Sequence, residues 1–232
     1  MTTIESTTVQ RLQPVAFDLY RDIHKGIRSE LFSVVIEAGR LDPADDCGIN
    51  ALADQIRQTV DLLVGHAHHE DGAIQPVLEL SAPALFERIA TDHEVLDGRL
   101  EWISELAGDV RGSASRRATL HELYLELASF TSAYLLHQDV EEREVAQALE
   151  SAVGLEGLLG IHGSIIGNMP PQQLISGLAV MFPTMNVEDR TELLGGMKAT
   201  APAEAFAGVW SLAKSVLSTD DRRAVEVRLG IA

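Results

Sequence analysis

Apolar residues recur at alternating spacings of three and four along the first two-thirds of the chain. This periodicity predicts amphipathic helices, because it places the apolar side chains on one face of each helix. Proline, glycine and serine interrupt the pattern at Pro14, 41–43, 81–83 and 112–115. The pattern therefore predicts four long helices, at about residues 14–39, 49–80, 83–106 and 116–151. Pro76 lies inside the second and is expected to kink it or end it early.

The last third of the chain follows a different pattern, because glycines and prolines divide it into shorter apolar segments. We expect five short helices there, at about residues 155–166, 171–181, 187–198, 202–217 and 219–229. Short connections favour antiparallel neighbours, so the long helices are predicted to form an all-α, up-down-up-down four-helix bundle. The predicted domains are this bundle at residues 12–153 and an additional C-terminal helical region at 154–232. The second region carries enough apolar side chains to pack on the bundle or to form a homodimer.

Composition and charge exclude several classes of partner. The formal net charge of −17 repels phosphate backbones, so no nucleic acid is expected to bind. No run of eighteen apolar residues occurs, so no membrane partner is expected. The N-terminal residues lack the basic and apolar regions of a signal peptide, and Cys47 is the single cysteine. A cytoplasmic location is therefore the simplest prediction.

Each of the four apolar stripes includes one histidine, and two stripes add a glutamate four residues later. These side chains are His24, His66, Glu70, His93, His137 and Glu141. In an up-down-up-down bundle, residues at one level lie symmetrically about each connection. The midpoint of the first two histidines is residue 45 and that of the last two is residue 115, both inside predicted turns. The six side chains are therefore expected to meet in one layer of the core.

Such a layer would be costly to bury without partners. A pair of metal ions removes that cost, and nitrogen and oxygen ligands without thiolate suit iron, manganese or zinc. The alternative is a metal-free helical interaction protein whose histidines are hydrogen-bonded core residues. Tyr20, one turn before His24, is either an extra ligand, a hydrogen-bond donor or a core tyrosine. Asp97 either orients His93 or is an exposed carboxylate, and His69 is an alternative ligand.

Four motifs in order resemble those of the haemerythrin-like (HHE cation-binding) family. They are DLYRDIHKGIR at 18–28, HAHHED at 66–71, DHE at 92–94 and HQDVEE at 137–142. The resemblance covers roughly residues 12–150 and implies two non-haem iron ions, carboxylate- or oxo-bridged, with zinc or manganese as lesser alternatives. It implies that the six histidine and glutamate residues are the ligands. Glu70 and Glu141 are the implied bridges, although the residues alone leave open whether they bridge or cap.

This chain departs from the oxygen-carrying members of that family at two places. Those carry H-x-x-x-H on the third helix and H-x-x-x-x-D on the fourth, whereas here Asp97 follows His93 and Glu141 follows His137. Losing one histidine argues against simple O₂ carriage and favours a site that reacts with O₂, peroxide or NO. The function implied is sensing, storage or detoxification, including catalase-like or NO-scavenging activity. The alternatives are a di-iron oxidase or oxygenase acting on an organic substrate and an iron-dependent regulatory module.

Overall fold

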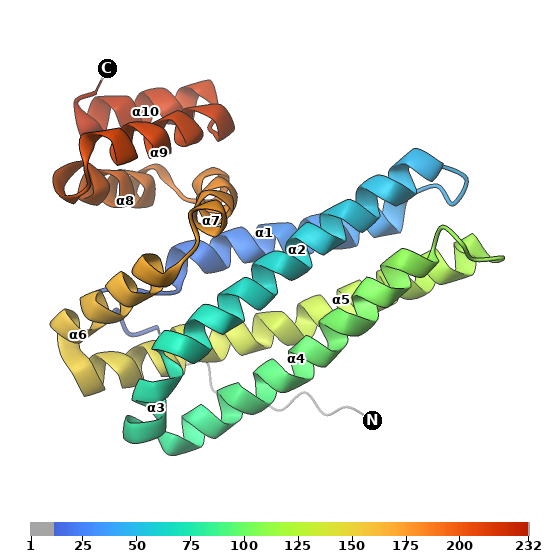
Figure 1. Ribbon diagram of the computed structural model, residues 1–232, viewed down its shortest axis with the longest axis horizontal. Coiled ribbons are helices and arrows are strands. Elements are labelled where there is room, and N and C mark those ends of the chain that lie inside the picture. Colours follow the sequence, from blue (N-terminus) through green and yellow to red (C-terminus); the bar gives the residue numbers. More distant parts are fainter. Residues whose placement is uncertain (1–11, 232) are drawn as a thin grey trace.

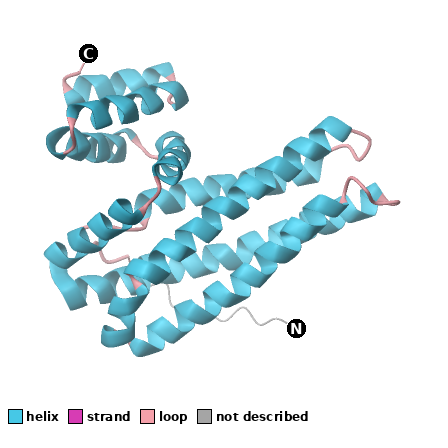
Figure 2. Cartoon of the chain, in the orientation of Figure 1, coloured by secondary structure: helices cyan, strands magenta, loops and turns pink. Residues whose placement is uncertain are grey.

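The computed structural model describes residues 12–231, which form helices and no strand (Figures 1 and 2). The long helices are α1 (Arg21–Arg40), α2 (Asp46–Ala73), α4 (Pro83–Asp109) and α5 (Arg116–Val140), with the short α3 (Gln75–Ser81) between α2 and α4. After α5 follow the π-helical turn η1 (Glu141–Val145), α6 (Ala146–Asn168), α7 (Pro171–Thr184), α8 (Val187–Thr200), α9 (Ala203–Val216) and α10 (Thr219–Leu229). The all-α fold expected from the sequence is confirmed.

Helices α1, α2, α4 and α5 form the predicted bundle, in which consecutive long helices run in opposite directions and α1 packs on α5 (Figure 1). One apolar core fills the bundle toward its loop end and includes Ile27, Leu31, Leu63, Leu96, Leu127 and Phe130. A second apolar core fills the other end, where α3 and α6 close the bundle, and includes Tyr20, Ile74, Leu78, Ile89, Val145 and Leu149. The two cores leave one layer between them.

Two helix boundaries differ from the prediction. The first helix begins at Arg21 and not at Pro14, because the Asp18 carboxylate accepts hydrogen bonds from the backbone amides of Tyr20 and Arg21 at 3.0 and 2.9 Å. A carboxylate that satisfies free amides in this way favours a helix start at that point. The second predicted helix is two helices, since α2 ends at Ala73 and Pro76 lies in the first turn of α3, where proline is tolerated.

The fourth predicted helix is also longer and less regular than the sequence pattern indicates. A π-helical turn, η1, separates α5 from α6, and such turns are frequent at functional sites. Helix α6 then continues to Asn168 across a bend at Gly154, whose φ is 61° and ψ is −173°. The domain boundary predicted between residues 153 and 154 falls inside α6 at this bend, and Leu158 and Ile161 beyond it still pack in the second apolar core. Only glycine adopts that backbone conformation without strain.

We therefore expect Gly154→Ala to lower the free energy of unfolding by about 1–3 kcal/mol, the usual cost of a strained backbone conformation. No heavy atom lies within 4 Å of a Cβ at this position, so the loss would come from the backbone and not from a clash. Urea denaturation at equilibrium measures it. Gly163→Ala, in the same helix with ordinary φ and equally open space, is the control and should be neutral or stabilising. Equal effects of the two substitutions would contradict this account.

The C-terminal helices α7 to α10 surround a third apolar core of Leu178, Phe182, Met185, Leu194, Ala213 and Val225. A buried arginine strengthens it, since Arg190 donates hydrogen bonds to the backbone oxygens of Phe182 and Pro183 at 2.7 and 3.2 Å. Those carbonyls lie at the C-terminal end of α7, where a cation is favourable. All four helices lie close to the segments predicted between residues 171 and 229.

Helix α7 packs directly on α1, in Figure 1 above the bundle. The contact is close, because a Cβ on Gly26 would lie 2.7 Å from Cγ1 of Val180. Ion pairs also join α1 to α8, since Lys25 pairs with Asp189, and Arg21 pairs with Glu192 at 3.1 Å. The C-terminal helices are therefore anchored to the same helix that carries His24.

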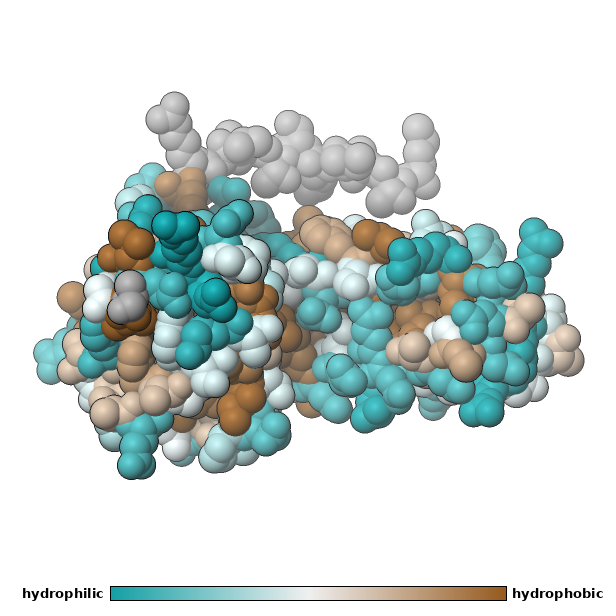
Figure 3. All heavy atoms as spheres, turned by 90° about the horizontal axis from the view of Figure 1, so that it is seen from above, coloured by the Kyte–Doolittle hydropathy of each residue, from teal (hydrophilic) through white to brown (hydrophobic). Residues whose placement is uncertain are grey.

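The surface seen in Figure 3 is a mixture of hydrophilic residues and scattered apolar ones. Among the helices that the structure describes, none combines the length and the apolar character needed to cross a lipid bilayer.

Candidate metal centre

The four histidines and two glutamates singled out in the sequence lie in the single polar layer between the two apolar cores of the bundle. His24 lies on α1, His66 and Glu70 on α2, His93 on α4, and His137 with Glu141 on α5 and η1. Their side chains are buried, with exposed fractions from 0% for His24 to 10% for His66. The expected meeting of these residues in one layer is therefore observed.

The six side chains form two groups that share both glutamates. One group contains His24 and His66 with Glu70 and Glu141, and the other contains His93 and His137 with the same glutamates. Within each group, one candidate ligand atom per residue lies within 4.8 Å of all the others. The imidazole Nε2 atoms point inward: that of His66 is 3.1 Å from Glu70 Oε1, and that of His137 is 3.1 Å from Glu141 Oε1.

Acidic side chains contact the outward-facing Nδ1 atoms of three of these histidines. Glu142 Oε1 lies 3.0 Å from His24 Nδ1 and Asp71 Oδ1 lies 2.9 Å from His93 Nδ1, both at hydrogen-bond distance, whereas Asp92 Oδ2 lies 3.6 Å from His137 Nδ1, which makes no hydrogen bond. Such partners orient a metal-binding imidazole and raise its basicity. Of the two alternatives given for Asp97, the structure agrees with the exposed carboxylate, since Asp71 and not Asp97 contacts His93 Nδ1.

Several polar atoms of the layer lack a hydrogen-bond partner within the described protein. They include both carboxylate oxygens of Glu70, Oε2 of Glu141 and Nε2 of His93. Buried polar atoms are nearly always satisfied in native proteins, so this cluster requires partners from outside the chain. Two cations would satisfy these atoms, and the donors are nitrogen and oxygen atoms suited to iron, manganese or zinc. The residues present therefore fit a pair of metal ions.

Comparison with known families agrees with this geometry. The profile of the family described as Hemerythrin HHE cation binding domain matches residues 15–149, which is more than half of the chain. The chain belongs to this family. No curated protein and no solved structure gave a match. The HHE domain thus spans the bundle and the polar layer, while α7 to α10 lie outside the matched residues.

In the metal-free HHE domain the buried ligands perturb one another's protonation. Burial raises the pKa of Glu70 well above its usual range, and the nearby Glu141 charge raises it further. Burial would also raise the pKa of Glu141, but His137 and His93 outweigh it and hold that pKa well below its usual range. Burial and the adjacent His24 lower the pKa of His66 to about 3. Bound metal ions would supply the positive charge beside the buried carboxylates that protons supply in the metal-free protein.

Two tyrosines flank the polar layer of the HHE domain. The Tyr20 ring lies 5.1 Å from that of His24, and the Tyr134 ring lies 5.7 Å from that of His137. Burial raises the pKa of both hydroxyls well above the usual value, and the charges of Glu70 and Glu141 add to the effect. Tyr20 was singled out in the sequence, whereas Tyr134 was not. Both hydroxyls stay protonated at neutral pH and remain available as donors.

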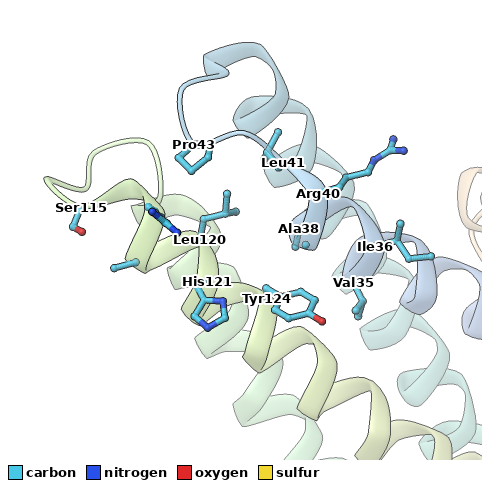
Figure 4. A pocket seen from close by; sticks show the side chains of 13 residues that line it. Val35, Ile36, Ala38, Arg40, Leu41, Pro43, Ser115, Leu120, His121 and Tyr124 are labelled. Atoms are coloured by element: carbon cyan, nitrogen blue, oxygen red, sulfur yellow. The ribbon is translucent and has the colours of Figure 1, made fainter.

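Two further histidines, His69, which the sequence offered as an alternative ligand, and His121, lie outside the polar layer. His69 belongs to neither ligand group, and its ring lies 6.2 Å from that of His68 near the surface. His121 lines a cavity of about 920 Å³ at the loop end of the bundle, between α1 and α5 (Figure 4). That cavity also contacts Gly39, Arg117 and Tyr124 and none of the six ligand candidates. It is therefore separate from the metal centre.

Proposed function

We propose that this HHE-domain protein binds two iron ions in the polar layer and reacts there with a small oxidant or gas, namely O₂, H₂O₂ or NO. The observation that supports this proposal is the pair of ligand groups, each with two histidines, that share Glu70 and Glu141. Bound iron would supply direct ligation of the small molecule and a change of redox state. Sensing, storage and detoxification are the roles that this chemistry serves.

The chain's own residues support a small ligand over an organic substrate. Leu63 precedes His66 by one turn and, with Leu31, Leu100 and Phe130, lines a void of about 10 Å³ in the apolar core. That is space for about one water-sized molecule, and the lining offers it no polar surface. Apolar side chains on both sides of the layer exclude water from the ligands. Tyr20 and Tyr134 hold protonated hydroxyls beside the layer, where an anionic oxygen would need a donor.

The first test is the metal content and absorption spectrum of the protein after aerobic purification. We expect two iron ions per chain, one for each ligand group, and near-ultraviolet bands of an oxygen-bridged ferric pair. Peroxide, NO and O₂ are then added separately to the reduced and to the oxidised protein. The change in the absorption spectrum after each addition shows which of them reacts with the site. If the protein takes up no transition metal, even after anaerobic reconstitution with ferrous ion, the proposal fails.

An iron-dependent regulatory module is the second candidate, and one contact favours it. Helix α1 carries His24 on its inner face and contacts α7 at Gly26, so metal binding and docking of the C-terminal helices involve the same two turns of α1.

Ligands that bind only the folded state stabilise it, by about 4 kcal/mol at a ligand concentration a thousand times Kd. Removing the metal with a chelator should therefore lower the melting temperature. A regulatory role further requires that α7 become accessible to protease in the metal-free protein, whereas unchanged cleavage of α7 would argue against it.

A further inference from the structure

The two ligand groups have different electrostatic surroundings. We call the position between His93 and His137 position A and the position between His24 and His66 position B, with Glu70 and Glu141 common to both. The shared glutamates cannot make the two positions unequal by their charge alone. Any difference must come from the side chains around the histidines.

Three uncompensated carboxylates surround position A. Asp71 lies 2.9 Å from Nδ1 of His93, and Asp92 lies 3.6 Å from Nδ1 of His137. Asp97 follows His93 by one helical turn and interacts electrostatically with it. No lysine or arginine among residues 12–231 forms an ion pair with any of these three carboxylates.

Position B has one carboxylate, and a cation offsets it. Glu142 Oε1 lies 3.0 Å from Nδ1 of His24, but the same oxygen accepts a hydrogen bond from Arg28 at 2.7 Å. Nδ1 of His66 contacts no hydrogen-bond partner within the described part of the chain, and this side chain is the most exposed of the six, at 10%. Each position thus has one hydrogen-bonded outer nitrogen, since Nδ1 of His137 also lacks a hydrogen-bond partner, and the negative charge around the histidines is weaker at position B.

These differences have a direct consequence for metal binding. A carboxylate on the outer nitrogen of a ligating histidine makes the imidazole a better ligand, and its loss costs 10–100-fold in affinity. Negative charge nearby also favours the more highly charged ion. We propose that the two positions are unequal: position A fills first and retains the higher metal charge, and position B fills second and loses its metal first. This inference rests on the proposed function, because it requires that the layer bind two metal ions.

The test is a calorimetric titration of the full-length, metal-free protein with Co²⁺, followed also by the visible absorption of the bound ion. We expect two binding steps whose dissociation constants differ by at least about tenfold. His66→Ala should remove the weaker step and leave the tighter one, whereas His93→Ala should remove the tighter step. Circular dichroism verifies that each variant keeps its helices.

Conservative changes around the histidines give a sharper test with a matched control. Asp71→Asn should weaken the tighter step by about 10–100-fold and leave the weaker one unchanged. Arg28→Gln should tighten the weaker step, because it frees the Glu142 carboxylate to act on His24 alone. Asp61→Asn, at an exposed position of the same helix as Asp71, is the control and should change neither step.

The outcomes separate this inference from the proposed function. Two equal steps would overturn the inference but leave the proposed function intact. The same holds if Asp71→Asn spares the tighter step while Glu142→Gln weakens it. Absence of any Co²⁺ binding to the unaltered protein would instead refute the di-metal site on which both depend.

Discussion

Glu141→Gln is expected to remove both metal ions, and not one, because this side chain belongs to both ligand groups. Its carboxylate lies 3.1 Å from His137 Nε2 and 3.5 Å from His24 Nε2, so it joins the two halves of the layer. An amide supplies one neutral oxygen in place of two charged ones, which leaves four buried histidines with a single carboxylate. Iron content after reconstitution, measured by elemental analysis, should fall from two ions per chain to near zero.

Glu122→Gln is the matched control for this change. Glu122 lies on α5 at an exposed position, forms no ion pair with another described residue and should leave the iron content unchanged. Retention of one firmly bound iron by Glu141→Gln would show that Glu141 caps one ion and does not bridge. Retention of both would mean that Glu141 is not a ligand.

Gly26→Leu should detach the C-terminal helices from the bundle. A Cβ at this position would lie 2.7 Å from Val180 Cγ1 and 3.3 Å from the Val180 backbone, so a leucine cannot fit unless α7 moves. Overpacking of this kind costs about 1–3 kcal/mol. Urea denaturation measures the loss of stability, and amide hydrogen exchange along α7 should show faster exchange at residues 171–184.

Gly98→Leu tests whether any glycine-to-leucine change in a long helix has the same effect. Gly98 lies on α4 with no heavy atom within 4 Å of a Cβ, so leucine there should be neutral or stabilise the helix by about 0.5–1 kcal/mol. Similar destabilisation by both substitutions, with no change in exchange along α7, would contradict the docking of α7 at Gly26.

The sequence predicted the bundle and its polar layer because both follow from periodicity. The spacing of four between His66 and Glu70, and between His137 and Glu141, places each pair on one face of a helix. The symmetry of the histidines about the loops then places the pairs at one level. Neither step needs knowledge of tertiary contacts, which explains why the six residues were found together.

Features that depend on contacts between helices were not predicted. Asp71 and Asp97 are both acidic neighbours of the layer in the sequence, and only the rotation of α2 against α4 decides that Asp71 contacts His93. A usable signal existed, since Asp71, Asp92 and Glu142 each adjoin a ligand residue in the chain. The docking of α7 on Gly26 had no such signal, because a single glycine in a helix does not indicate what packs against it.

The π-helical turn at Glu141–Val145 has a consequence for how this segment tolerates change. A π turn holds one more residue than an α turn, and each residue of an α-helix advances the direction of its side chains by about 100°. Ala146 and Leu149, which follow the turn, are buried at 6% and 0% exposure in the second apolar core. Deleting one residue between 142 and 145 would convert the π turn into an α turn and leave these side chains facing the core, whereas a deletion in a regular α-helical turn would rotate them by about 100°. The π turn therefore accommodates an extra residue next to Glu141 without changing which face of α6 packs in the second apolar core.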